Sequence, residues 1–253
     1  MTIVALFIFL IGLCVGSFLN VLIFRLDKKR GAFTGRSECP GCSKQLKWYD
    51  LVPVISYLFL EGRCRYCKEK ISPIYPVVEI ITAFSFLGFY LIQRPESLAF
   101  SLFYLLIIAS LTALIFFDYL YFIIPDKVIF SLVPVILLFD FLFRRTQFNS
   151  LLLSALTLGS VFAIIHLVSH GQWMGFGDAK LMFLIGLVLG YPLGFIAMTL
   201  SIWSAALVGI VLMVLGKATR RTPLPFGSFL AGVSIIIIIF QKIVSDIVLI
   251  LFF

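Results

Sequence analysis

Long apolar stretches dominate this chain of 253 residues. A helix needs about 20 apolar residues to cross the hydrocarbon core of a bilayer. Hydrophobic residues make up 62% of the sequence and charged residues 13%, whereas soluble domains are seldom more than about half apolar. The composition excludes a soluble globular domain and predicts an all-α polytopic membrane protein. Eight transmembrane helices are expected, at about 2–24, 74–92, 97–117, 128–143, 150–168, 179–192, 194–215 and 227–252.

The basic residues predict how these segments are oriented. No basic residue precedes the segment 2–24, and the segment is too long for the apolar core of a signal peptide, so it is expected to be a retained helix. With the N-terminus outside, three basic residues fall in outer loops and Lys242 falls within the last segment. Positive charge concentrates on cytoplasmic loops. The other sixteen basic residues fall on the predicted cytoplasmic side, namely Arg25, Lys28, Lys29, Arg30, Arg36, Lys44, Lys47, Arg63, Arg65, Lys68, Lys70, Lys127, Lys180, Lys217, Arg220 and Arg221.

Residues 25–73 are the only sizeable segment between the predicted helices, and they carry two C-x-x-C pairs. Cys39 and Cys42 are separated by 21 residues from Cys64 and Cys67. Two such pairs predict one structural zinc site with four thiolates, which would stabilise a domain too small for a sizeable core. Two disulfides are the alternative, disfavoured in the reducing cytoplasm, and a redox pair is a further one. Cys14 lies inside the first predicted helix and is expected to be a small core residue.

Two aspartates lie at the cytoplasmic ends of apolar segments. Asp178 follows Gly175 and Gly177 at the start of one segment, and Asp118 closes another. Asp178 could simply cap its helix and pair with Lys180 or lipid headgroups. Paired aspartates can instead share a proton, one acting as acid and the other as base. This predicts aspartic-protease chemistry, with the glycines admitting a substrate backbone. Asp126, after Pro125, is interpreted as a helix-start residue.

Two other classes of function remain open from the residues alone. Carboxylates within a membrane can relay protons or ions, as in transporters, although no inverted repeat is visible. A noncatalytic scaffold of a secretion system could use residues 25–73, the cysteine loop, for docking. The turn at Pro225, Phe226 and Gly227 is either a helix start or an irregular backbone able to pair with an extended peptide. A cleavage test with the purified protein would separate these classes.

The ordered set of motifs resembles the type IV prepilin peptidases. These are bifunctional leader peptidases and N-methyltransferases of bacterial pilus, secretion and competence systems, and they share Gly-x-Gly-Asp with other membrane aspartic proteases. The resemblance covers nearly the whole chain. It is carried by the two cysteine pairs, Gly62 to Arg65, Tyr75 to Glu79, Asp118 eight residues before Asp126, Gly175 to Leu181, and Pro225 to Gly227. Leu120 departs from the family, which commonly has a further aspartate there.

The resemblance implies specific roles. Asp118 and Asp178 would be catalytic, supported by Gly175, Gly177, Lys180, Pro225, Phe226 and Gly227. Zinc would be held by Cys39, Cys42, Cys64 and Cys67. The substrate would be a prepilin or pseudopilin whose short basic leader is removed at the cytoplasmic face of a bacterial inner or plasma membrane. Methylation of the new N-terminus would use S-adenosylmethionine, with Gly62 and Glu79 as weak candidates for binding it. No nucleic-acid partner is expected. The expected domains are 1–24, 25–73 and a peptidase domain at 74–253.

Overall fold

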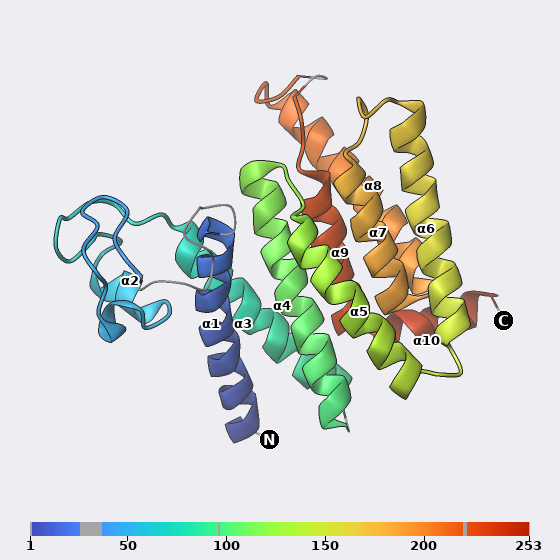
Figure 1. Ribbon diagram of the computed structural model, residues 1–253, viewed down its shortest axis with the longest axis horizontal. Coiled ribbons are helices and arrows are strands. Elements are labelled where there is room, and N and C mark those ends of the chain that lie inside the picture. The colour runs from blue at the N-terminus through green and yellow to red at the C-terminus, as the bar shows by residue number, and fades with distance from the viewer. Residues whose placement is uncertain (1, 26–36, 96, 220–221, 253) are drawn as a thin grey trace. The chain divides into compact units, whose positions relative to one another are not determined.

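The computed structural model describes residues 2–25, 37–95, 97–219 and 222–252. Within these ranges the chain forms α-helices and one short 3₁₀ helix, with no β-strand beyond two isolated bridges, which confirms the all-α prediction. Six basic residues used to predict the topology lie outside the described residues, namely Lys28, Lys29, Arg30, Arg36, Arg220 and Arg221. Figure 1 shows the helices in chain order. They are α1 (Thr2–Arg25), η1 (Trp48–Asp50), α2 (Ile55–Phe59), α3 (Ile74–Gln93), α4 (Leu98–Tyr121), α5 (Asp126–Phe143), α6 (Phe148–Val168), α7 (Phe176–Leu189), α8 (Leu193–Val214), α9 (Phe226–Ile239) and α10 (Gln241–Phe252).

The chain folds as two compact units, Met1–Ala113 and Leu114–Phe253, and α4 spans the boundary between them. In the first unit, α1 packs closely along α3. A Cβ atom on Gly12 would lie 2.5 Å from the Cα atom of Ala83, and one on Gly16 would lie 2.6 Å from the Cα atom of Glu79. The side-chain amide of Asn20 donates a hydrogen bond of 3.0 Å to the carbonyl of Tyr75. Gly12 and Gly16 thus form a small-residue packing face on α1, and Asn20 bonds this helix to α3.

In the second unit, the short helix α7 is surrounded by other helices. It contacts α5, α6, α8 and α9, and ten of its 14 residues are buried. A Cβ atom on Gly186 would lie 2.5 Å from the Cα atom of Ala155, so α6 and α7 pack backbone to backbone. This packing holds the first turn of α7, which contains Asp178, in a fixed environment.

In the described part of the chain, five helices are long and apolar enough to cross a membrane: α1, α3, α4, α6 and α8. The helices α9 and α10 count as a sixth span only if taken as one broken segment. The expected total of eight is therefore not confirmed. At 14 residues, α7 is only about 21 Å long, short of the roughly 30 Å hydrocarbon core. The helix α5 carries three charged residues, Asp126, Lys127 and Asp140.

The prediction of one continuous helix over 227–252 is wrong. The helix α9 ends at Ile239, and α10 leaves it at an angle of 81°. Gln241 and Lys242 interrupt the apolar run at this point. Polar side chains favour contact with water over contact with lipid, which accounts for the change of helix direction between α9 and α10.

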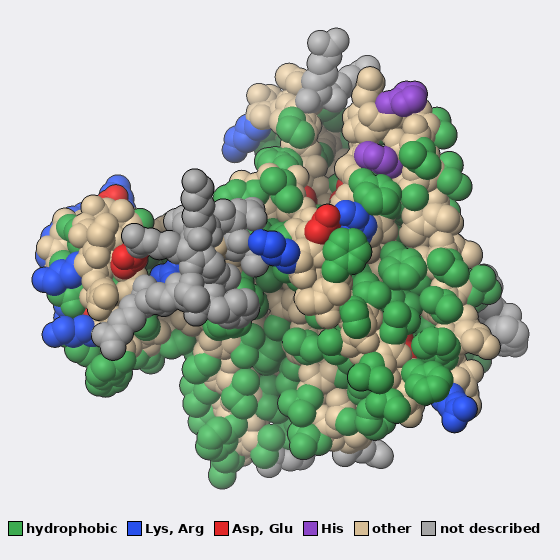
Figure 2. All heavy atoms as spheres, viewed as in Figure 1, with side chains coloured by type: hydrophobic (Ala, Val, Ile, Leu, Met, Phe, Trp, Pro, Cys, Tyr) green, Lys and Arg blue, Asp and Glu red, His purple; other side chains and the backbone are tan. Residues whose placement is uncertain are grey.

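The outer surface matches a protein that lies in a bilayer. Figure 2 shows hydrophobic side chains spread along the helices, while the charged side chains visible on this face lie near helix ends and on the loop segment. Large apolar side chains such as Leu102, Leu153 and Trp203 are more than half exposed. Exposed apolar area on this scale indicates contact with lipid.

Candidate active site and metal centre

The second unit contains a cavity of about 980 Å³ that collects residues from four separated stretches of the chain. They come from the end of α4 and the following loop, from the α6–α7 loop and the start of α7, from α8, and from the segment that leads into α9. Six predicted site residues line it: Asp118, Gly175, Gly177, Asp178, Lys180 and Phe226. Ligand sites of this size are usually concave and largely preformed.

Asp118 is buried in the last turn of α4 and is bonded to the start of α9. Its Oδ2 atom accepts a hydrogen bond of 2.7 Å from the backbone N–H of Ser228. The hydroxyl of Ser228 lies 3.1 Å from the same oxygen. Gly227 lies directly beneath this carboxylate, since a Cβ atom there would be 3.1 Å from Asp118 Oδ2. The motif of Pro225, Phe226 and Gly227 therefore brings the start of α9 against Asp118.

Asp178 is buried in the first turn of α7, which begins after the cap residue Gly175. The backbone N–H of Asp178 donates a hydrogen bond of 3.2 Å to the carbonyl of Gly175, and the residue lines the same cavity as Asp118. The tertiary structure thus brings together two carboxylates that are sixty positions apart in the sequence.

The loop between α4 and α5 closes one side of this site. Ile124, which is buried, packs against both glycine motifs: a Cβ atom on Gly177 would lie 3.1 Å from Ile124 Cβ, and one on Gly227 would lie 2.9 Å from Ile124 Cδ1. A larger residue at Gly227 would displace the end of the Ile124 side chain or press on the Asp118 carboxylate. These glycines therefore allow close packing around Asp118 and Asp178, the two carboxylates called the dyad below. The sequence did not predict this role.

Lys180 and Asp126 pair at the edge of the cavity. The Lys180 Nζ atom lies 2.6 Å from Asp126 Oδ1, and it also lies 5.0 Å from the ring centroid of Phe176. Asp126 is the first residue of α5, as predicted from Pro125. The ion pair ties the start of α5 to the first turn of α7, the same turn that carries Asp178.

The four loop cysteines form a second site, in the first unit. Their Sγ atoms all lie within 4.8 Å of one another, and the Sγ atoms of Cys39 and Cys67 are 3.7 Å apart. A tetrahedral zinc with Zn–S bonds of about 2.3 Å separates its sulfurs by roughly 3.8 Å. All four thiols are free of disulfide bonds. The cluster could therefore hold one metal ion, and the alternative of two disulfides is not seen.

The two cysteine pairs have the same backbone geometry. The N–H of Ser43 donates to the carbonyl of Cys39 at 2.8 Å, and the N–H of Lys68 donates to the carbonyl of Cys64 at 3.0 Å. Ser43 and Lys68 both have positive φ angles, of 54° and 61°. A hydrogen bond from the backbone of Cys67 lowers the pKa of the Cys64 thiol to about 7, whereas burial raises the pKa of the Cys39 thiol, and burial with contacts to the other cysteines raises the pKa of Cys67 to about 12. Of these three thiols, Cys64 most readily forms the thiolate that metals bind.

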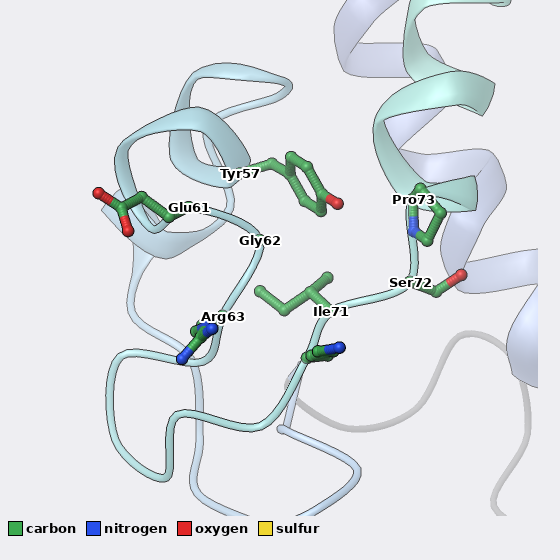
Figure 3. Close-up of a pocket in the computed structure, with 8 residues that line it drawn as sticks. Tyr57, Glu61, Gly62, Arg63, Ile71, Ser72 and Pro73 are labelled. Atoms are coloured by element: carbon green, nitrogen blue, oxygen red, sulfur yellow. The ribbon is translucent and has the colours of Figure 1, made fainter.

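The two cofactor candidates are not brought to one place. Gly62 lines a cavity of about 430 Å³ together with Tyr57, Arg63 and Ile71. Figure 3 shows the Tyr57 ring and the Ile71 side chain facing this space, whereas the Glu61 carboxylate points away. Glu79 does not line it. Its Oε2 atom accepts a hydrogen bond of 2.7 Å from the N–H of Val54, where α2 begins.

Comparison with known proteins identifies the family. The profile of the bacterial peptidase A24 N-terminal domain matches residues 10–92, and that of the type IV leader peptidase family matches residues 105–240. The chain belongs to the type IV leader peptidase family. Within this family, a protein of Bacillus subtilis (strain 168) named prepilin leader peptidase/N-methyltransferase is 31% identical over 90% of this chain and 91% of its own length.

Other members of the family are similar over the same extent. Proteins with the same name in Aeromonas salmonicida (strain A449) and Pseudomonas aeruginosa are 31% and 30% identical, over 88% of this chain and about as much of their own. No solved structure matches the chain significantly. The predicted family is confirmed, and the comparisons give no support to the transporter and scaffold alternatives.

Proposed function

We propose that this membrane protein is an aspartic endopeptidase that removes the leader of a prepilin or pseudopilin and then methylates the new N-terminus. The observation that carries the peptidase half is the cavity in which Asp118 and Asp178 lie together. Buried acids in a membrane protein are costly and mark functional sites. The names of the relatives supply the substrate class.

The two carboxylates can perform peptide hydrolysis without a metal. One carboxylate takes a proton from a water molecule, whose oxygen then bonds to the scissile carbonyl carbon, while the other carboxylic acid protonates the carbonyl oxygen. Collapse of the tetrahedral intermediate breaks the C–N bond, and a proton passes to the leaving amine. The two carboxyls exchange roles and return to a single shared proton. The four thiolates would hold zinc with no open position, so zinc would act only as a structural ion.

The decisive experiment is cleavage by the purified full-length protein in detergent or liposomes. The substrate is a prepilin with an intact leader, and mass spectrometry identifies the new N-terminus. We expect cleavage at the leader boundary and none with the Asp118→Asn or Asp178→Asn variants. A transporter or a scaffold would leave the prepilin intact, so absence of cleavage by the wild-type protein would refute the proposal.

We further propose that the N-terminus lies outside and the cysteine loop in the cytoplasm, because the basic residues favour that side by sixteen to three. In a Cys14→Ser background, a cysteine replacing Trp48, which is 79% exposed, should resist an impermeant thiol reagent in intact cells. A cysteine replacing Thr146, in the exposed α5–α6 connection, should react. The labelling of each variant is compared with that of the Cys14→Ser protein, which retains the four loop cysteines. The reverse pattern would contradict the orientation.

For methyl transfer, we propose that S-adenosylmethionine binds in the cavity at Gly62. The aromatic ring of Tyr57 offers a face to a sulfonium cation, and Arg63 and Lys70 offer cations to a carboxylate. Glu79, bonded to Val54 outside the lining, would support the domain rather than contact the cofactor.

Gly62→Ala should abolish transfer of labelled methyl groups to cleaved pilin while cleavage continues. Gly62 has a φ of +66°, and a Cβ atom there would lie 2.9 Å from the Tyr57 hydroxyl. Gly216→Ala is the matched control, because Gly216 also has a positive φ but has no atom within 4 Å of such a Cβ. Normal methyl transfer by Gly62→Ala would exclude this cavity, and absence of transfer by the wild type would restrict the protein to cleavage.

A further inference from the structure

Ser228 is the third residue of α9, and both of its donors lie on one oxygen of Asp118. The backbone N–H is 2.7 Å from Oδ2, and the hydroxyl oxygen is 3.1 Å from the same atom. Gly227 makes this approach possible because it has no Cβ atom to collide with the carboxylate. The Oδ2 atom is thus occupied by two contacts from the protein, and the proton of the acid form is directed to Oδ1.

The Ser228 hydroxyl has a second acceptor within reach. The carbonyl of Ile115, one turn before Asp118 on α4, lies 2.9 Å from Ser228 Oγ. A hydroxyl carries one proton and can rotate it. When Asp118 is ionised, the proton can point to Oδ2, since hydrogen bonds to charged acceptors are the stronger ones. When Asp118 is protonated, the hydroxyl proton can turn to Ile115 without any movement of heavy atoms.

We propose that Ser228 is a positioning residue of the dyad, which holds Oδ2 of Asp118 in both protonation states and leaves Oδ1 for exchange with water and Asp178. This inference rests on the proposed peptidase function. It assigns to α9 a part in the proton cycle that neither the Gly-x-Gly-Asp motif nor the family match describes.

The test compares Ser228→Ala, Ser228→Thr and Ser234→Ala in the full-length protein with a prepilin substrate. Loss of one hydrogen bond to a charged group should lower kcat of Ser228→Ala by about 10- to 100-fold, with KM and thermal stability near wild type. Ser228→Thr keeps the hydroxyl and should recover most of the rate. Ser234→Ala is the control, because Ser234 is buried in the same helix but bonds only within it, to Leu230.

A second measurement separates this inference from the proposed function, because it needs no substrate. Carbodiimide modification of Asp118, followed by mass spectrometry across pH, reports when the carboxyl is protonated. A lost donor leaves the ionised form of Asp118 less stable. The pH at which half of Asp118 is modified should therefore be higher in Ser228→Ala than in the wild type, and it should be unchanged in Ser228→Thr. Failure of the wild-type protein to cleave prepilin would overturn only the proposed function. A Ser228→Ala variant with an unchanged modification profile, or with unchanged kcat, would overturn the role of Ser228.

Discussion

Replacing either Asp118 or Asp178 by asparagine is expected to abolish prepilin cleavage, with a loss on the order of 10³-fold or more. Asparagine keeps the size of the side chain but can neither take a proton from water nor give one to the substrate. Each variant should fold, because asparagine matches aspartate in size and, at position 118, can still accept the hydrogen bond from the backbone of Ser228. The measurement is the initial rate of leader removal by purified protein, with zinc content and thermal unfolding recorded in parallel.

Asp246→Asn is the control for the dyad variants. Asp246 is exposed on α10 and takes no part in the cavity, so its variant should cleave at the wild-type rate. If either dyad variant cuts prepilin at a rate close to wild type, the aspartic mechanism is wrong. The combined variant should be no slower than either single one, because both residues act in one proton cycle.

Replacing Cys39 and Cys42 together by serine is expected to release the metal and to unfold the loop around them. Purified wild-type protein should contain about one zinc per chain, and structural zinc contributes roughly 10–16 kcal/mol of apparent binding free energy in small domains. The described part of the loop, residues 37–73, has little regular structure beyond η1 and α2. Without the metal, hydrogen exchange and limited proteolysis within 37–73 should rise sharply.

Cys14→Ser is the matched control, because Cys14 is a free cysteine on α1 that does not belong to the cluster; it is exposed, so the expectation of a core residue at this position is wrong. This variant should keep its zinc and its protected loop. Leader cleavage should survive loss of the zinc better than methyl transfer does, because the dyad lies in the second unit and the Gly62 cavity lies beside the cysteine pairs. A metal-free native protein with a fully protected loop would contradict the zinc assignment.

Several features of the fold could be predicted because their causes are local. The predicted segments start and end within a few residues of α1, α3 and α6, since the hydrophobic run sets the length of a membrane helix. Pro125 correctly predicted that α5 begins at Asp126. The packing face on α1 has an equally local cause, because Gly12 and Gly16 lie one turn apart on the same side of a helix.

Other features depend on neighbours distant in the sequence and could not be predicted. The run at 179–192 looked like a membrane span, but α7 is a 14-residue helix buried among four others. Gln241 and Lys242 interrupt the apolar run near Phe240, but apolar residues continue on both sides of them, so the sequence did not distinguish a sharp bend from a continuous span. Hydropathy reports how apolar a segment is, and it does not report whether lipid or protein surrounds it.

For the proposed active site, the sequence by itself predicted which carboxylates could act together, because Asp118 closes one apolar run and Asp178 starts another on the same predicted side of the membrane. It also predicted which four cysteines could hold a metal ion, since two C-x-x-C pairs in one segment are a specific pattern, and the structure brings these four together. Only the tertiary structure decided that Ser228 holds Asp118 and that Ile124 packs against Gly177 and Gly227. A serine at the third position of a helix has many ordinary roles. Its role here arises from the close approach of α9 to α4, a contact between residues 110 positions apart.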